Sequence, residues 1–154
     1  MMLGETSSVA LKAKAVVGLG NPDRTDDGVG LAVVEGLSPR PGLDVFASVK
    51  TGMDLAMALL PYKQVLLVDA APFLPVGEVA LLRLGDTQNA QGFPHGVSLA
   101  QAFSWLREMG WRVPEVWILA VGVPAEVGFG RGLSPKVQEA LPKAREVVER
   151  WLAS

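Results

Sequence analysis

Cysteine is absent from this chain of 154 residues. The absence excludes disulfide bonds, thiolate metal sites and cysteine nucleophiles, and it fits a reducing compartment, so we expect a cytoplasmic protein. Histidine is almost absent as well, since His95 is the one histidine of the sequence. Any metal site or acid–base step that requires an imidazole must therefore use His95.

Charge and long apolar runs are also in short supply. Only 19% of the residues are charged, the formal net charge is −2, and lysine and arginine form no cluster, so we expect no nucleic-acid partner. No apolar run approaches the ~18 residues that a membrane helix needs, and residues 1–13 lack the pattern of a signal peptide, so we expect no membrane contact. We interpret residues 1–13 as an N-terminal extension and residues 14–154 as a single domain.

Strand-like and helix-like segments alternate along this domain. Apolar runs rich in β-formers predict strands at 14–19, 43–49, 65–68, 78–84 and 116–123, and helical spacing of apolar residues predicts helices at 29–37, 55–60, 98–109 and 134–151. The alternation is typical of a three-layer α/β/α fold with a mainly parallel, twisted sheet. The strands at 65–68 and 78–84 follow each other without a helix, which allows one antiparallel strand in a β-meander.

Several residues mark the ends of the expected helices. Thr51–Asp54 and Ser98–Gln101 have the spacing of capping boxes, in which a side chain bonds to the first turn of the helix. Gly110 fits the end of the helix that begins at Ser98. Pro142 lies inside the last expected helix, which it should kink or divide.

Two aspartates and the histidine fall where ligands bind in folds of this class, beyond the carboxyl ends of the strands. Asp27 lies in the loop after the first strand, Asp69 lies at the end of the third apolar run, and His95 precedes a helix. Two carboxylates and an imidazole form an open three-ligand set for a borderline divalent ion such as nickel or zinc. The sequence therefore predicts a candidate metal site of Asp27, Asp69 and His95.

Each of these residues also has an ordinary structural interpretation. Asp26 or Asp27 can cap the helix that follows them. Asp69 can accept hydrogen bonds from a neighbouring turn, and His95 can be a solvated loop residue. Other kinds of site fit poorly, because the glycines at 18 and 20 lack the third glycine of a dinucleotide-binding loop and no Gly-x-Ser-x-Gly elbow is present. We therefore expect neither a nucleotide cofactor nor a serine hydrolase mechanism.

Five sequence blocks, in this order, resemble those of one protein family. The first is Gly18-x-Gly20-Asn21, followed after four residues by Asp26-Asp27-Gly28-x-Gly30. The others are TGMDL at 51–55, VDA at 68–70, PHGVSL at 94–99, and VGVP at 121–124 with GLSPKV at 132–137. Together they extend from about residue 14 to the end of the chain, and they resemble the hydrogenase maturation proteases.

This resemblance implies an endopeptidase that removes the C-terminal extension from the large-subunit precursor of a nickel–iron hydrogenase after nickel insertion. By motif position it implies that Asp27, Asp69 and His95 are the catalytic and metal-contacting residues. It also implies that nickel arrives with the precursor, and that a monomer meets this partner transiently. The chain departs from many family members at 22–24, where apolar residues are common, and at Asp27, where some have the longer glutamate.

Other functions agree with parts of the sequence. The block at 18–22 also resembles the opening of peptidyl-tRNA hydrolases, but the histidine that follows there and the basic surface for tRNA are missing. A non-catalytic nickel checkpoint or chaperone could bind the immature subunit through the same residues. For the enzyme, polarisation of the scissile carbonyl and activation of water are both open roles for nickel.

Overall fold

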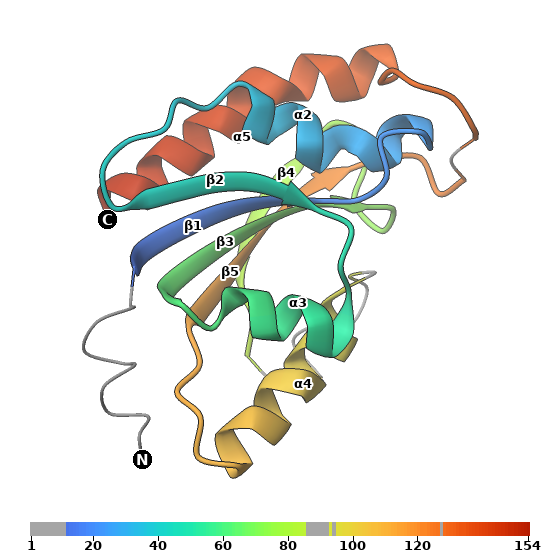
Figure 1. The fold of residues 1–154 in the computed structure, drawn as a ribbon. Helices are drawn as coiled ribbons and strands as arrows, with labels where there is room; N and C mark the ends of the chain where they lie inside the picture. The colour runs from blue at the N-terminus through green and yellow to red at the C-terminus, as the bar shows by residue number, and fades with distance from the viewer. Residues whose placement is uncertain (1–11, 86–92, 94, 127) are drawn as a thin grey trace.

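The computed structural model describes residues 12–85, 93, 95–126 and 128–154 (Figure 1). No helix in this part of the chain has both the length and the apolar character that a membrane crossing requires. In chain order the elements are β1 (Lys12–Leu19), the 3-10 helix η1 (Thr25–Gly28), α2 (Val29–Glu35), β2 (Leu43–Ser48), α3 (Gly52–Leu59), β3 (Tyr62–Ala71), β4 (Val79–Arg83), α4 (Gly96–Glu108), β5 (Glu115–Gly122) and α5 (Pro135–Ala153).

The strands form one sheet in the order β2-β1-β3-β5-β4. β1 pairs in parallel with β2 and β3, and β3 pairs in parallel with β5, whereas the edge strand β4 runs antiparallel to β5. A mainly parallel sheet with one antiparallel strand is therefore confirmed. The expected β-meander is wrong, because β5 lies between β3 and β4. The segment between β3 and β4 crosses the end of β5 and is hydrogen-bonded to it. The N–H of Gly77 donates to the carbonyl of Gly122 at 2.9 Å, and the N–H of Gly122 donates to the carbonyl of Glu78 at 2.8 Å.

Alternate residues of the central strands point into two separate cores. In β1, Ala15 and Val17 belong to one core and Val16 to the other. Figure 1 shows α2 and α5 covering one face of the sheet and α3 and α4 covering the other, so the three-layer α/β/α prediction is confirmed. Because both faces are covered, the accessible edge for a ligand is the row of loops at the carboxyl ends of the parallel strands.

Strand β1 starts at Lys12, so the first residues of the strand come from the segment that we interpreted as an extension. The rest of that segment, residues 1–11, lies outside the described residues. Further along the strand, the Lys14 ammonium donates to the carbonyls of Trp151 at 3.3 Å and Leu152 at 3.1 Å. A cation thus satisfies carbonyls at the C-terminal end of α5, where the helix dipole is negative.

The two predicted capping boxes differ from the helix starts that the structure shows. Thr51 is at the N-cap of α3 as expected, but it makes no side-chain cap hydrogen bond. α4 starts at Gly96, before the expected cap at Ser98, whose hydroxyl donates instead to the carbonyl of His95 at 3.4 Å. Neither predicted capping box is therefore formed. At the other end of α4, Gly110 has the positive φ of 90° that suits a helix terminator, as predicted.

Helix α5 continues through Pro142, so of the two expected effects, a kink or a division of the helix, the division does not occur. Pro142 has no N–H for the carbonyl one turn earlier, which removes a helix hydrogen bond. A stripe of buried side chains on both sides of the proline holds the helix against the sheet. It consists of Val137, Leu141, Ala144, Val148 and Trp151.

Candidate active site

Asp69 lies inside β3, at the carboxyl edge of the sheet. The strand continues through Ala70 and Ala71, which pair with β5, so the prediction that it ends at Asp69 is wrong. Strand alternation places Asp69 on the same face as Leu67 and Ala71, which belong to the core beneath α3 and α4. Its side chain is only 3% exposed. A carboxylate buried to this degree needs hydrogen-bond partners.

Both oxygens of the Asp69 carboxylate have such partners. Oδ1 accepts from the backbone N–H of Ala70 at 2.9 Å, and Oδ2 lies 2.9 Å from Nδ1 of His95. Because an ionised carboxylate can only accept, Nδ1 carries the proton and donates it. In the neutral imidazole the lone pair is then on Nε2, which is the atom that can bind a metal or take up a proton.

His95 reaches β3 because it is the N-cap residue of α4. Its side chain is 20% exposed, so a ligand can approach it. The hydrogen bond to Asp69 raises the pKa of His95 above its ordinary 6.5; burial opposes the rise, and the charges of Asp69 and then Asp27 add to it. The helix η1, which carries Asp27, contacts β3, which carries Asp69.

Asp27 is held in the turn that follows β1. Its Oδ2 accepts from the backbone N–H of Asn21 at 2.9 Å, and its own N–H donates to the carbonyl of Arg24 at 3.1 Å. The side-chain oxygen of Asn21 accepts from the N–H of Asp23 at 2.9 Å, which closes an Asx turn. Asp27 is half-buried.

Asp26, the neighbour of Asp27 in η1, has a different role in the structure. It is only 4% exposed, and its Oδ1 accepts from the backbone N–H of Ser134, the N-cap residue of α5, at 2.7 Å. Gly28 is the N-cap residue of α2 and makes no side-chain cap hydrogen bond, so neither aspartate caps that helix. The bond to Ser134 was not predicted from the sequence.

The three candidate side chains do not form a complete metal cage. The part of the chain that the structure describes contains no cluster of three His, Cys, Asp or Glu residues arranged to hold a metal ion. Asp69 and His95 are bonded to each other, and the Asp27 carboxylate is bonded to Asn21. The donor types nevertheless fit a borderline divalent ion, with an imidazole nitrogen and carboxylate oxygens at one edge of the sheet.

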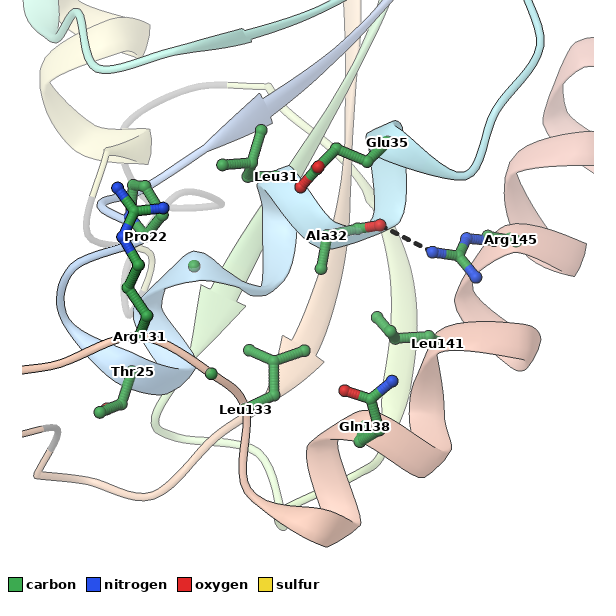
Figure 2. A pocket seen from close by; sticks show the side chains of 12 residues that line it. Pro22, Thr25, Leu31, Ala32, Glu35, Arg131, Leu133, Gln138, Leu141 and Arg145 are labelled. Atoms are coloured by element: carbon green, nitrogen blue, oxygen red, sulfur yellow. Dashed lines mark hydrogen bonds between the residues drawn. The ribbon is translucent and has the colours of Figure 1, made fainter.

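A pocket of about 400 Å³ lies against α2 and α5 (Figure 2). Leu31, Leu133 and Leu141 form its apolar wall, and Arg145 donates to the carbonyl of Ala32 at 2.7 Å beside it. None of the three candidate residues lines this pocket. The candidate site therefore lies at the carboxyl edge of the sheet and not in this pocket.

Solved structures of known proteins share this fold. The hydrogenase maturating endopeptidase HybD from E. coli is 24% identical, with a TM-score of 0.76 over 92% of each chain. The [NiFe] hydrogenase maturation protease HycI from Thermococcus kodakarensis KOD1 is 21% identical, with a TM-score of 0.68 over 99% of each chain. The hydrogenase 2 maturation peptidase from Thaumarchaeota archaeon SCGC_AB-539-E09 is 24% identical, with a TM-score of 0.66 over 92% of this chain and 99% of the other. At such identities the likeness shows the fold alone.

The family itself is shown by a sequence model. A comparison with curated proteins gives no match. The model of the hydrogenase maturation proteases, however, matches residues 38–151, a segment that includes Asp69 and His95. This match covers well over half of the chain, and it confirms the resemblance seen in the sequence blocks. The chain belongs to the hydrogenase maturation protease family.

Proposed function

We propose that this protein is an endopeptidase that removes the C-terminal extension of a nickel–iron hydrogenase large-subunit precursor after nickel insertion. The observation that carries the proposal is the Asp69–His95 hydrogen bond of 2.9 Å at the carboxyl edge of the sheet. Asp27 lies in η1, which contacts β3, and its charge adds to the rise in the pKa of the same imidazole. This group of side chains belongs to a chain of the hydrogenase maturation protease family, which supports both the reaction and the kind of partner.

The three side chains have distinct tasks in this proposal. Nickel arrives as part of the precursor, and Asp27 and Nε2 of His95 receive it. Asp69 keeps the imidazole in the tautomer that leaves the lone pair on Nε2, and its carboxylate would supply an oxygen donor from the lone pairs that its two hydrogen bonds leave free. Nickel held there can polarise the scissile carbonyl or activate water. In either case the water oxygen bonds to the carbonyl carbon, the C–N bond breaks and a proton passes to the leaving amine.

The test of the proposal is a cleavage reaction. The purified protein is incubated with a hydrogenase large-subunit precursor, with and without nickel, and the intact mass of the precursor is followed over time. We expect the loss of a C-terminal peptide from the nickel-loaded precursor alone. Nickel-dependent binding without a change in mass would identify a non-catalytic checkpoint instead. A precursor that is neither bound nor cleaved would contradict the proposal.

The ionisation of His95 should be directly measurable, since it is the one histidine of the chain. We expect its NMR signals to titrate with a pKa above 6.5, because Asp69 accepts its hydrogen bond. Asp69→Asn should lower this pKa, since that bond is the largest cause of the rise, and Asp27→Asn should lower it less, since Asp27 acts through its charge alone. Equal pKa values in the three proteins would contradict this arrangement.

The raised pKa acts in opposite directions on activity and on stability. Nickel ligation requires a neutral imidazole, so kcat/KM should fall as the pH drops through the pKa of His95 in the folded protein. Protonation of His95 increases the free energy of unfolding, because the pKa of His95 is higher in the folded state than in the unfolded chain. That contribution is complete below the unfolded pKa and is lost as the pH rises through the folded pKa. Parallel profiles of kcat/KM and thermal unfolding against pH would measure both trends.

A further inference from the structure

Two charged residues are buried within the described part of the chain, Asp69 and Asp26. Asp69 belongs to the candidate site, whereas the proposed function assigns no task to Asp26. Burial of a carboxylate is unfavourable without a hydrogen bond, so the partner of Asp26 is informative. That partner is the backbone N–H of Ser134, at 2.7 Å and 108 positions away along the chain.

This contact is one of several links between the loop after β1 and the loop after β5. The N–H of Thr25 donates to the carbonyl of Gly130 at 2.8 Å, and the N–H of Gly130 donates to that of Asp23 at 2.7 Å. Arg131 also pairs with Asp23 at 3.0 Å, but both side chains are largely exposed, and such pairs contribute little. The bond from Asp26 to α5 differs from that ion pair because its carboxylate is buried.

The bond also attaches η1 to a long helix and not only to another loop. α5 has 19 residues, no acidic residue in its first turn, and a proline there that lacks an N–H. Asp26 supplies a negative charge where the helix dipole is positive. The bond is short, with 2.7 Å between the backbone nitrogen of Ser134 and Oδ1 of Asp26. This hydrogen bond therefore fixes the position of η1 relative to α5.

We infer that Asp26 is a positioning residue for Asp27. Asp27 is the next residue of η1, so the peptide that Asp26 holds is the one that carries the Cα of Asp27. The side chains have different partners, since Asp27 accepts from the N–H of Asn21 while Asp26 accepts from that of Ser134. Asp26 therefore sets the place of the Asp27 carboxylate without contacting the substrate. The inference rests on the proposed function, from which the task of Asp27 comes.

Four variants separate positioning from a general effect on stability. Asp26→Ala removes the acceptor, and Asp26→Asn retains an oxygen that can accept from Ser134. Ser134→Pro removes the donor at a residue whose φ of −65° suits proline, and Ser134→Ala removes only the hydroxyl. Each variant is compared with the wild type by circular dichroism and thermal unfolding. Cleavage of the nickel-loaded precursor is then measured well below the unfolding midpoint of every variant.

We expect Asp26→Ala and Ser134→Pro to lower kcat by about 10- to 100-fold, the range that a small misplacement of a reacting group can produce. KM should change little, because the precursor still docks. Asp26→Asn and Ser134→Ala should retain most of the wild-type kcat. Wild-type kcat in folded Asp26→Ala and Ser134→Pro proteins would overturn the inference, and so would an equal loss in all four variants. If the wild type itself does not cleave, the proposed function fails and the inference fails with it.

Discussion

Replacement of His95 by alanine is expected to lower kcat/KM for cleavage of the nickel-loaded precursor by about 10²- to 10⁴-fold. The change removes Nε2, the atom that we propose receives nickel, together with the Nδ1–H group that donates to Asp69. Asp69 is 3% exposed and would keep the N–H of Ala70 as its partner. The free energy of unfolding should therefore fall as well, by about 1–3 kcal/mol. Intact mass of the precursor and urea unfolding of the variant measure the two effects.

A second variant separates the lost nitrogen from the lost hydrogen bond. In the His95→Asn protein the amide nitrogen can take the place of Nδ1 and donate to Asp69, but nothing replaces Nε2. We expect this protein to unfold nearly as the wild type does and still to leave the precursor uncut. Retained cleavage by either folded variant would remove His95 from the proposed mechanism. Loss of cleavage with retained nickel-dependent binding would place His95 in the reaction and not in recognition.

That Asp69 and His95 lie at one edge of the sheet could be predicted from the sequence, but the hydrogen bond between them could not. The prediction followed from topology, because the carboxyl ends of parallel strands meet at one edge of the sheet. The hydrogen bond between Asp69 and His95 depends on where α4 begins, and the sequence placed that start at Ser98 instead of Gly96. A difference of two residues at a helix start turns a solvated loop histidine into a half-buried partner of β3.

Asp69 shows that an apolar sequence pattern predicts which side chains are buried but not how far a strand extends. The pattern reports which side chains are buried, and a polar residue therefore marked the end of the third strand. The backbone ladder depends on pairing, and it continues through Ala70 and Ala71 against β5. A carboxylate fits within the strand because its two oxygens find a backbone N–H and an imidazole.

The different tasks of Asp26 and Asp27 have almost no signature in the sequence. Two adjacent aspartates before a helix are equivalent as candidates for a cap or for a ligand. One signal was present, since the segment that begins at Ser134 starts a helix with no acidic residue in its first turn. It points to a missing negative charge, but it does not say that the charge comes from a residue 108 positions earlier.

Gly20→Ala is expected to displace the candidate site even in a folded protein. Gly20 has a φ of +118°, and a Cβ there would lie 2.1 Å from the carbonyl oxygen of Asp27. The unfavourable backbone conformation should destabilise the protein by about 1–3 kcal/mol. The close contact adds about 1–3 kcal/mol, and because it involves backbone, η1 must move to relieve it. We expect kcat to fall by about 100-fold, since the peptide of Asp27 moves with η1.

The matched control is Gly110→Ala, at the end of α4. Gly110 also has a positive φ, +90°, but a Cβ there would meet nothing within 4 Å. This variant shares the backbone strain without the contact, so it should lose about 1–3 kcal/mol of stability and keep the wild-type kcat. Urea unfolding and precursor cleavage, measured on both variants, then isolate the effect of the contact with Asp27. Equal losses of stability, with wild-type kcat in the Gly20→Ala protein, would mean that the turn absorbs a methyl group without moving Asp27.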